Sequence, residues 1–141
     1  MKENKILVLI TAQESCKRII DIANEYADRL AADVDVLTVQ PMKADAKRRS
    51  KDMICLTGLS RKTHRAIRII YSDQPLRAII SEAEKLEPIH IFVGQGSEKS
   101  SFLTGLRLAP INAPISVVGT DGIIYSLPSM LEDILALNPA N

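Results

Sequence analysis

The residues with the most chemical potential in this sequence form a polar stretch directly after an apolar run at residues 89–93. The stretch reads Gly94-Gln95-Gly96-Ser97-Glu98-Lys99-Ser100-Ser101. A buried strand that breaks into glycines and hydroxyls before an amphipathic segment predicts a strand-to-helix turn. Backbone N–H groups at such a turn attract anions, above all phosphate. The third spaced glycine of a dinucleotide fingerprint and the Gly-Lys-Ser/Thr pair of a P-loop are both missing, so the stretch predicts an anion site without naming a cofactor.

The serines of this stretch have two interpretations. Ser97, Ser100 and Ser101 could donate hydrogen bonds to a phosphate in place of the missing glycine N–H groups. Ser97 or Ser100 could instead cap the helix that follows, an interaction that stabilises a helix by on the order of 1 kcal/mol. Both interpretations place these serines at the start of one helix.

Residue types that perform catalysis or bind metals do not cluster elsewhere in the sequence. No group of His, Cys, Asp and Glu has the spacing of metal ligands, and no serine or cysteine has an evident base beside it. His90 lies inside an expected strand, where a buried histidine with one satisfied hydrogen bond is the common case. Cys16 and Cys55 are far apart and are expected to be free packing residues. We therefore expect no catalytic residue, no metal site and no enzyme activity.

The hydrophobic pattern of the chain alternates between two kinds of element. Continuous apolar runs predict strands covered on both faces, and apolar residues at three- and four-residue intervals predict helices. The expected strands are 5–10, 34–39, 66–71, 89–93 and 115–118, and the expected helices lie within 14–31, 42–63, 75–86 and 100–109. This alternation predicts a three-layer α/β fold, with helices on both faces of an open parallel five-stranded sheet.

Ligands of an open parallel sheet bind at the carboxyl ends of its strands, near the point where the strand order reverses. Thr11 follows the first expected strand, Val39 ends the second and Gly94 follows the fourth. If the first and fourth strands are neighbours, Thr11 faces the Gly94 turn across one crevice. We expect a mononucleotide there, with its base near Val39 and its phosphates over the turn. The expected nucleotide-binding residues are Thr11, Val39, Gly94, Gly96, Ser97, Ser100 and Ser101.

The end of the chain is expected to form a separate unit. We divide the chain into an α/β domain at residues 1–119 and a tail at residues 120–141. Apolar residues at i, i+3, i+4, i+7 and i+8 predict an amphipathic helix in this tail, with Ser126 near its start: Leu127, Met130, Leu131, Ile134 and Leu135. The apolar stripe could cover the edge of its own domain or bind a partner or a second copy.

Composition and charge narrow the range of partners. The chain is 46% apolar and 25% charged with a formal net charge of +1, which argues against DNA binding. Nine of the eighteen Lys and Arg residues lie between Lys43 and Arg68. The basic segment 43–51 is therefore either a solvated helix face or a docking site for an acidic partner or an anionic membrane surface. No apolar run is long enough to span a membrane and no signal peptide is evident, so we expect a cytoplasmic protein.

Over residues 4–119 the chain resembles the universal stress protein family, whose members contain UspA-like domains. The resemblance rests on the order and spacing of five segments: Lys5-Ile6-Leu7-Val8, Val36-Leu37-Thr38-Val39, Tyr71-Ser72-Asp73-Gln74-Pro75, Ile91-Phe92-Val93-Gly94 and Ala113-Pro114-Ile115-Ser116-Val117-Val118. It implies a Rossmann-like sheet in the strand order 3-2-1-4-5 and homodimers joined along the last strand. One branch of the family binds ATP, so the resemblance also implies ATP binding as an expectation for this chain.

The chain departs from that ATP-binding branch at three positions. Thr11 stands where those proteins have an acidic residue, and Ser97 stands where they have a glycine. Gly105 is followed by Leu106 where they have a Gly-Ser/Thr pair. The loop at residues 11–15 is more similar to the stress-protein-like domains of potassium-sensing histidine kinases.

Two functional hypotheses follow from these observations. The first is a dimeric, cytoplasmic, non-enzymatic regulatory module of the stress response that binds ATP or AMP with Mg²⁺, or another small anion, at the turn 94–101. The alternative is a protein-interaction module with a vestigial pocket, which binds partners through its last strand, its tail helix or the basic segment 43–51. Thr11 and the short stretch between Gly94 and Pro114 favour the alternative.

Overall fold

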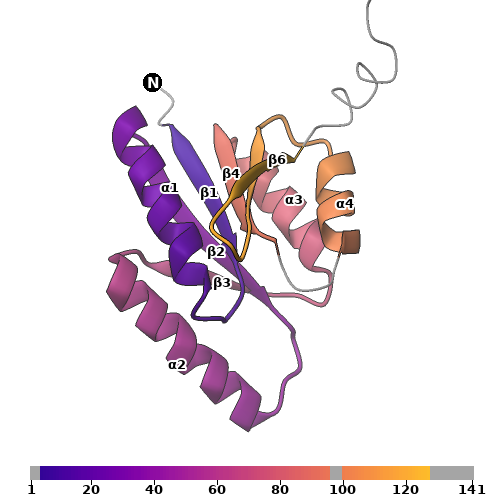
Figure 1. Cartoon of the computed structure of the whole chain (residues 1–141). Helices are drawn as coiled ribbons and strands as arrows, with labels where there is room; N and C mark the ends of the chain where they lie inside the picture. Colours follow the sequence, from indigo (N-terminus) through magenta and orange to yellow (C-terminus); the bar gives the residue numbers. More distant parts are fainter. Residues whose placement is uncertain (1–3, 96–99, 128–141) are drawn as a thin grey trace, which may run out of the picture.

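The chain folds into one sheet with helices on both of its faces (Figure 1). The computed structural model describes residues 4–95 and 100–127, with Ser100 and Ser101 described by their backbone alone. The elements are β1 (Lys5–Ile10), α1 (Cys16–Leu30), β2 (Asp33–Gln40), α2 (Ala46–Thr63), β3 (Ile67–Tyr71), α3 (Pro75–Leu86), β4 (His90–Gly94), α4 (Ser100–Leu108), β5 (Ile115–Val118) and β6 (Ile124–Leu127). Within these described ranges, no helix is both long enough and apolar enough to cross a lipid bilayer.

The strand order confirms the predicted α/β class and the neighbouring positions of the first and fourth strands. The sheet runs β3-β2-β1-β4-β5-β6, and β1 pairs in parallel with β2 on one side and with β4 on the other. The first five strands are parallel, and β6 pairs antiparallel with β5. The expected order 3-2-1-4-5 is therefore present, and a sixth strand extends it.

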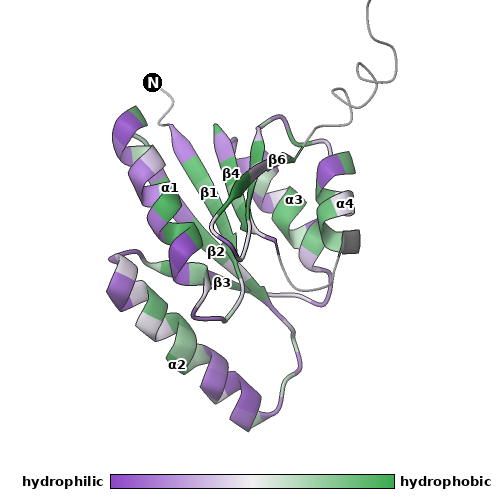
Figure 2. Ribbon diagram, viewed as in Figure 1, coloured by the Kyte–Doolittle hydropathy of each residue, from purple (hydrophilic) through white to green (hydrophobic). Residues whose placement is uncertain are grey.

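The hydrophobic core lies in two layers that the central strand β1 shares. Ile6, Val8 and Ile10 pack with α1 and α2 on one face of the sheet. Leu7 and Leu9 pack with α3 and α4 on the other face. Because successive side chains of a strand point to opposite faces, a strand that is covered on both sides must be apolar at every position. Figure 2 shows strands that are mostly hydrophobic and, on α1 and the first half of α2, segments that are hydrophilic.

The helices begin where the sequence supplies a suitable first turn. Pro75 occupies the first turn of α3, where its missing N–H group has no intrahelical acceptor to lose. Asp45 caps α2, because its side chain accepts a 2.7 Å hydrogen bond from the backbone N–H of Arg48. α2 is 18 residues long, yet its only buried residues are Leu56, Leu59 and Thr63. All three lie in the second half of α2, so its first half contributes no buried side chain to the core.

The predicted tail helix is wrong at its start. Ser126 and Leu127 belong to β6, which returns along β5 through a tight hairpin. Gly122 takes a left-handed backbone conformation (φ 83°) in that hairpin, and the Gly119 N–H donates to the Ile123 carbonyl at 2.8 Å. The rest of the expected helix lies outside the described residues. The sheet continues past residue 119 into β6, and the division of the chain into two units remains a prediction.

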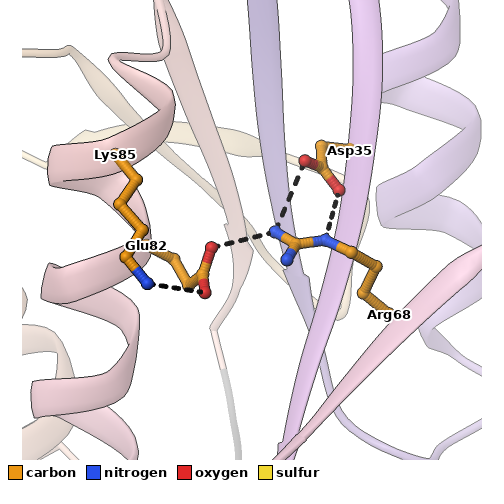
Figure 3. A network of polar contacts seen from close by, with 4 residues as sticks. All are labelled: Asp35, Arg68, Glu82 and Lys85. Atoms are coloured by element: carbon orange, nitrogen blue, oxygen red, sulfur yellow. Dashed lines mark hydrogen bonds and ion pairs between the residues drawn. The ribbon is translucent and has the colours of Figure 1, made fainter.

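Ion pairs tie the opposite edge of the sheet to α3 (Figure 3). Arg68 on the edge strand β3 contacts Asp35 on β2 and Glu82 on α3, each at 3.1 Å. Desolvation lowers the pKa of Arg68, but its hydrogen bonds to the two carboxylates outweigh this and leave the pKa raised. Charged side chains on an edge strand also discourage pairing with another sheet.

Two helical glycines, one in α4 and one in α2, provide a matched test of the packing between α3 and α4. A methyl group on Gly58 in α2 would meet nothing within 4 Å, whereas one on Gly105 in α4 would overlap Leu76 Cδ2 of α3. We expect Gly58→Ala to raise the free energy of unfolding by about 0.5–1 kcal/mol, because alanine lowers the entropy cost of the helix. We expect Gly105→Ala to show no such gain and to destabilise, since overpacking costs about 1–3 kcal/mol. Urea unfolding of both variants measures the difference, and equal stabilisation by both would contradict the close α3–α4 contact.

Candidate functional site

A cleft opens where the chain leaves β1 and β4 toward opposite faces of the sheet. β1 leads into α1 on one face and β4 leads toward α4 on the other, although the two strands are hydrogen-bonded neighbours. Diverging connections of this kind create a crevice at the carboxyl edge of a parallel sheet. The cleft has a volume of about 1600 Å³.

Three of the predicted site residues meet in this cleft. Thr11, Val39 and Gly94 all line it, as the sequence predicted from the ends of their strands. Thr11 is exposed, and Val39 and Gly94 are half-buried. Ser100 and Ser101 form the start of α4, as expected, but only their backbone is described. Gly96 and Ser97 lie outside the described residues, so their part in the site remains a prediction.

Gly94, which lines the cleft, and Gly105 in α4 both have packing roles. A Cβ atom on Gly94 would lie 2.8 Å from Cδ1 of Ile19, a buried residue of α1. The missing side chain therefore lets α1 pack closely on the end of β4. Gly105, which stands where the resembling proteins have a Gly-Ser/Thr pair, is likewise covered by Leu76 of α3. Both glycines are explained by helix packing, whether or not a ligand binds.

The β5–β6 hairpin forms one wall of the cleft. Arg18 in the first turn of α1 donates a 2.7 Å hydrogen bond from Nη1 to the carbonyl of Thr120 in the hairpin. Gly119 and Thr120 line the cleft beside it. The sequence interpretation missed this wall, although Asp121-Gly122 between two apolar runs is a strong hairpin signal.

The cleft contains cations of two kinds. Lys17 and Arg48 are paired with carboxylates, with Lys17 2.6 Å from Asp21 and Arg48 3.8 Å from Asp52. Arg18 and Arg77 instead donate to neutral acceptors, the Thr120 carbonyl and the side-chain amide oxygen of Gln74 at 3.3 Å. A guanidinium bonded to a neutral oxygen keeps its full charge available to an anion.

Both cysteines are free thiols, and neither of them is exposed. Cys16 is buried, and its Sγ lies 3.6 Å from the Thr11 hydroxyl. Burial raises the pKa of the Cys55 thiol, and the charges of Glu14, Cys16 and Asp52 raise it further. A raised pKa disfavours the reactive thiolate. Among the described residues, no group of three or more His, Cys, Asp or Glu side chains could hold a metal ion.

His90 lies at the beginning of β4, at the end of the strand away from the cleft. Its Nε2 is 2.8 Å from the Ser116 hydroxyl, and its ring stacks on Phe92 at a centroid distance of 4.6 Å. Tyr26 of α1 packs against the same ring at 4.9 Å. Burial lowers the pKa of His90 from its usual 6.5. His90 is thus a hydrogen-bonded packing residue, as the sequence predicted.

Comparisons with known proteins identify the fold. No protein-family model and no curated protein sequence matches the chain. Among solved structures, a universal stress protein from Archaeoglobus fulgidus superposes with a TM-score of 0.66 at 17% identity, covering 83% of this chain and 94% of that one. The universal stress protein from the same organism in complex with dAMP gives 0.61 at 16% identity, over 83% and 98% of the two chains. A universal stress protein family member from Arabidopsis thaliana with AMP bound gives 0.56 at 19% identity, over 82% and 91%. The chain therefore has the fold of the universal stress proteins.

The environment of His90 predicts a dependence of stability on pH. Because the folded state lowers the pKa of His90, the unfolded chain binds a proton at higher pH than the folded protein does. This contribution to stability is present above about pH 6.5 and is lost as the pH falls through the lowered pKa. We expect His90→Gln, which keeps a hydrogen-bonding group near Ser116, to flatten the decline of the melting temperature below neutral pH. The control variant His64→Asn changes the other histidine and should show the same decline of the melting temperature as the unmodified chain. An unchanged decline in His90→Gln would contradict the assignment of this pH dependence to His90.

Proposed function

We propose that this protein is a cytoplasmic regulatory module of the universal stress protein family that binds an adenine nucleotide in the cleft between β1 and β4. The observation that carries the proposal is the meeting of Thr11, Val39 and Gly94 in one cleft of about 1600 Å³ at the carboxyl edge of the sheet. Support comes from two solved structures with the same fold, in which dAMP and AMP are bound. A cleft of this volume can accommodate a mononucleotide.

The lining of the cleft suits the two halves of a nucleotide. Apolar side chains can cover a base near Val39: Leu9, Val39, Ile79, Phe102 and Leu103. Arg18 and Arg77 can meet phosphate oxygens, because neither is neutralised by a carboxylate in the part of the chain that the structure describes. Thr11 places a hydroxyl where an acidic residue would repel an anion. The proposed function is binding and signalling, not catalysis.

Ligand-induced stabilisation tests this function directly. We expect the melting temperature of the purified chain to rise with Mg-ATP or Mg-AMP and not with inorganic phosphate. A ligand at about a hundred times its dissociation constant adds about 2.7 kcal/mol to the free energy of unfolding, which raises the melting temperature of a domain this size by several degrees. No shift with any adenine nucleotide would contradict the proposal and favour an interaction module with a vestigial pocket.

A pair of threonine variants locates the binding site. Thr11 is exposed within the cleft, whereas Thr57 is exposed on α2 away from it. We expect Thr11→Phe to place a ring in the cleft beside the proposed phosphate position and abolish the nucleotide-dependent shift without lowering the melting temperature of the free protein. Thr57→Phe adds the same bulk elsewhere and should retain the shift.

Arg18→Gln should weaken the binding of phosphate-bearing ligands about tenfold or more, because hydrogen bonds to charged groups contribute about 1.5–3 kcal/mol. The same variant should leave the binding of adenosine, which has no phosphate, unaffected.

We further propose that the protein forms a homodimer through β6. β6 covers the outer edge of β5, so a dimer along the last strand would have to use β6. Three consecutive large apolar residues on this edge are about half exposed: Ile123, Ile124 and Tyr125. An uncharged apolar edge strand is a ready site for pairing with a second copy.

Light scattering on eluting protein measures this association. We expect the mass of a dimer for the unmodified chain and of a monomer for Ile124→Lys, because a charge on the edge strand opposes pairing. Ile54→Lys places the same charge on the exposed face of α2 and should remain a dimer. A monomeric mass for the unmodified chain at high concentration would contradict the proposal.

A further inference from the structure

The outward face of α2 carries a line of basic residues. Lys47, Lys51 and Arg61 follow one another at i, i+4 and i+14, spacings that place them on one side of the helix. All three are exposed. Gly58, at i+11 in the same line, has open space where a side chain would project, which confirms that the line faces away from the sheet.

Packing of the opposite side of α2 fixes this orientation. Leu56, Leu59 and Thr63 are the buried residues of the helix, and both leucines belong to the core layer shared with α1. The helix cannot rotate its basic line inward without exposing these residues. Figure 1 shows that the first half of α2 extends beyond the rest of the fold, and Figure 2 shows that this half is hydrophilic.

The carboxylates on and next to α2, Asp45 and Asp52, are bonded to Arg48 and not to the basic line. Asp45 caps the helix and accepts from the backbone of Arg48, and Asp52 pairs with the side chain of Arg48. Across the ranges 4–95 and 100–127, neither Lys47, Lys51 nor Arg61 has a carboxylate within ion-pair distance. The line therefore presents positive charge over about 21 Å, at 1.5 Å for each helical residue from 47 to 61.

Exposed aliphatic side chains accompany these charges. Ile54 lies in the line itself, at i+7 from Lys47, and is 73% exposed. Met42, four residues before the first residue of α2, is 60% exposed, and Met53, on a flank of the helix outside the line, is 40% exposed. A helix face with exposed cations and an exposed aliphatic side chain can combine attraction to anionic lipids with burial of apolar surface at the bilayer interface.

We propose that the outward face of α2 docks the protein on the anionic surface of a lipid bilayer, with Ile54 inserted at the interface. A straight line of flexible cations matches a flat, diffuse array of negative headgroups. Specific protein interfaces are instead depleted in lysine and enriched in aromatic residues, which the outward face of α2 lacks. The lack of aromatic residues also argues against single-stranded nucleic acid. This docking is independent of the nucleotide cleft.

Vesicle sedimentation with the full chain tests the docking. We expect the protein to bind vesicles of phosphatidylcholine mixed with phosphatidylglycerol, to release them at high ionic strength, and not to bind pure phosphatidylcholine. Lys47→Gln/Lys51→Gln should lower the partition constant about 25-fold, since each basic residue near an anionic surface contributes about fivefold. Arg29→Gln/Lys85→Gln removes the same charge from exposed sites on α1 and α3 and should lower it less than about twofold. All four positions are exposed, so the variants are expected to fold.

Three results would overturn the proposal. The first is failure of the unmodified chain to bind the anionic vesicles. The second is an equal loss of binding in the two double variants, which would show that only net charge matters. The third combines two observations: the unmodified chain binds duplex DNA more strongly than vesicles at the same phosphate concentration, and Ile54→Ser binds vesicles as well as the unmodified chain does. Together they would assign the outward face of α2 to nucleic acid.

Discussion

The central position of β1, buried on both of its faces, is the constraint on which the rest of this structure depends. Its side chains fill two core layers at once, so helices must cover both faces of the sheet. β1 is followed by a helix on one face, and its neighbour β4 is followed by a helix on the other. The cleft at their carboxyl ends results from that divergence, and the loops that end these strands line it.

The chemistry of the cleft comes from arginines more than from glycines. Gly94 makes room for Ile19, and Gly105 makes room for Leu76, so both have a packing reason that needs no ligand. Arg18 and Arg77 have neutral hydrogen-bond acceptors and retain charge that a phosphate could use. Arg18 also joins α1 to the β5–β6 hairpin. One side chain therefore connects α1, at the wall of the cleft, with the hairpin that leads into the edge strand β6.

The periphery of the fold separates three kinds of surface. The β3 edge carries the ion pairs of Arg68 with Asp35 and Glu82, which link strand, neighbouring strand and helix. The β6 edge is uncharged from Ile123 to Leu127 and apolar except for Ser126. The outward face of α2 is basic. The residues that we propose for dimer and membrane contacts, on β6 and α2, are separate from those that we propose for the nucleotide in the cleft.

The sequence alone determined the α/β class, the positions of the first five strands and the position of Thr11, Val39 and Gly94 at the carboxyl ends of their strands. It did so because the periodicity of apolar residues is a local property, and because parallel strands bring their carboxyl ends to one edge. Tertiary structure decided the rest. The Arg18–Thr120 hydrogen bond joins residues 102 positions apart, and β6 replaces the start of the expected tail helix because pairing with β5 satisfies its backbone hydrogen bonds. Contacts between segments so distant depend on how the elements pack, which no local pattern of residues records.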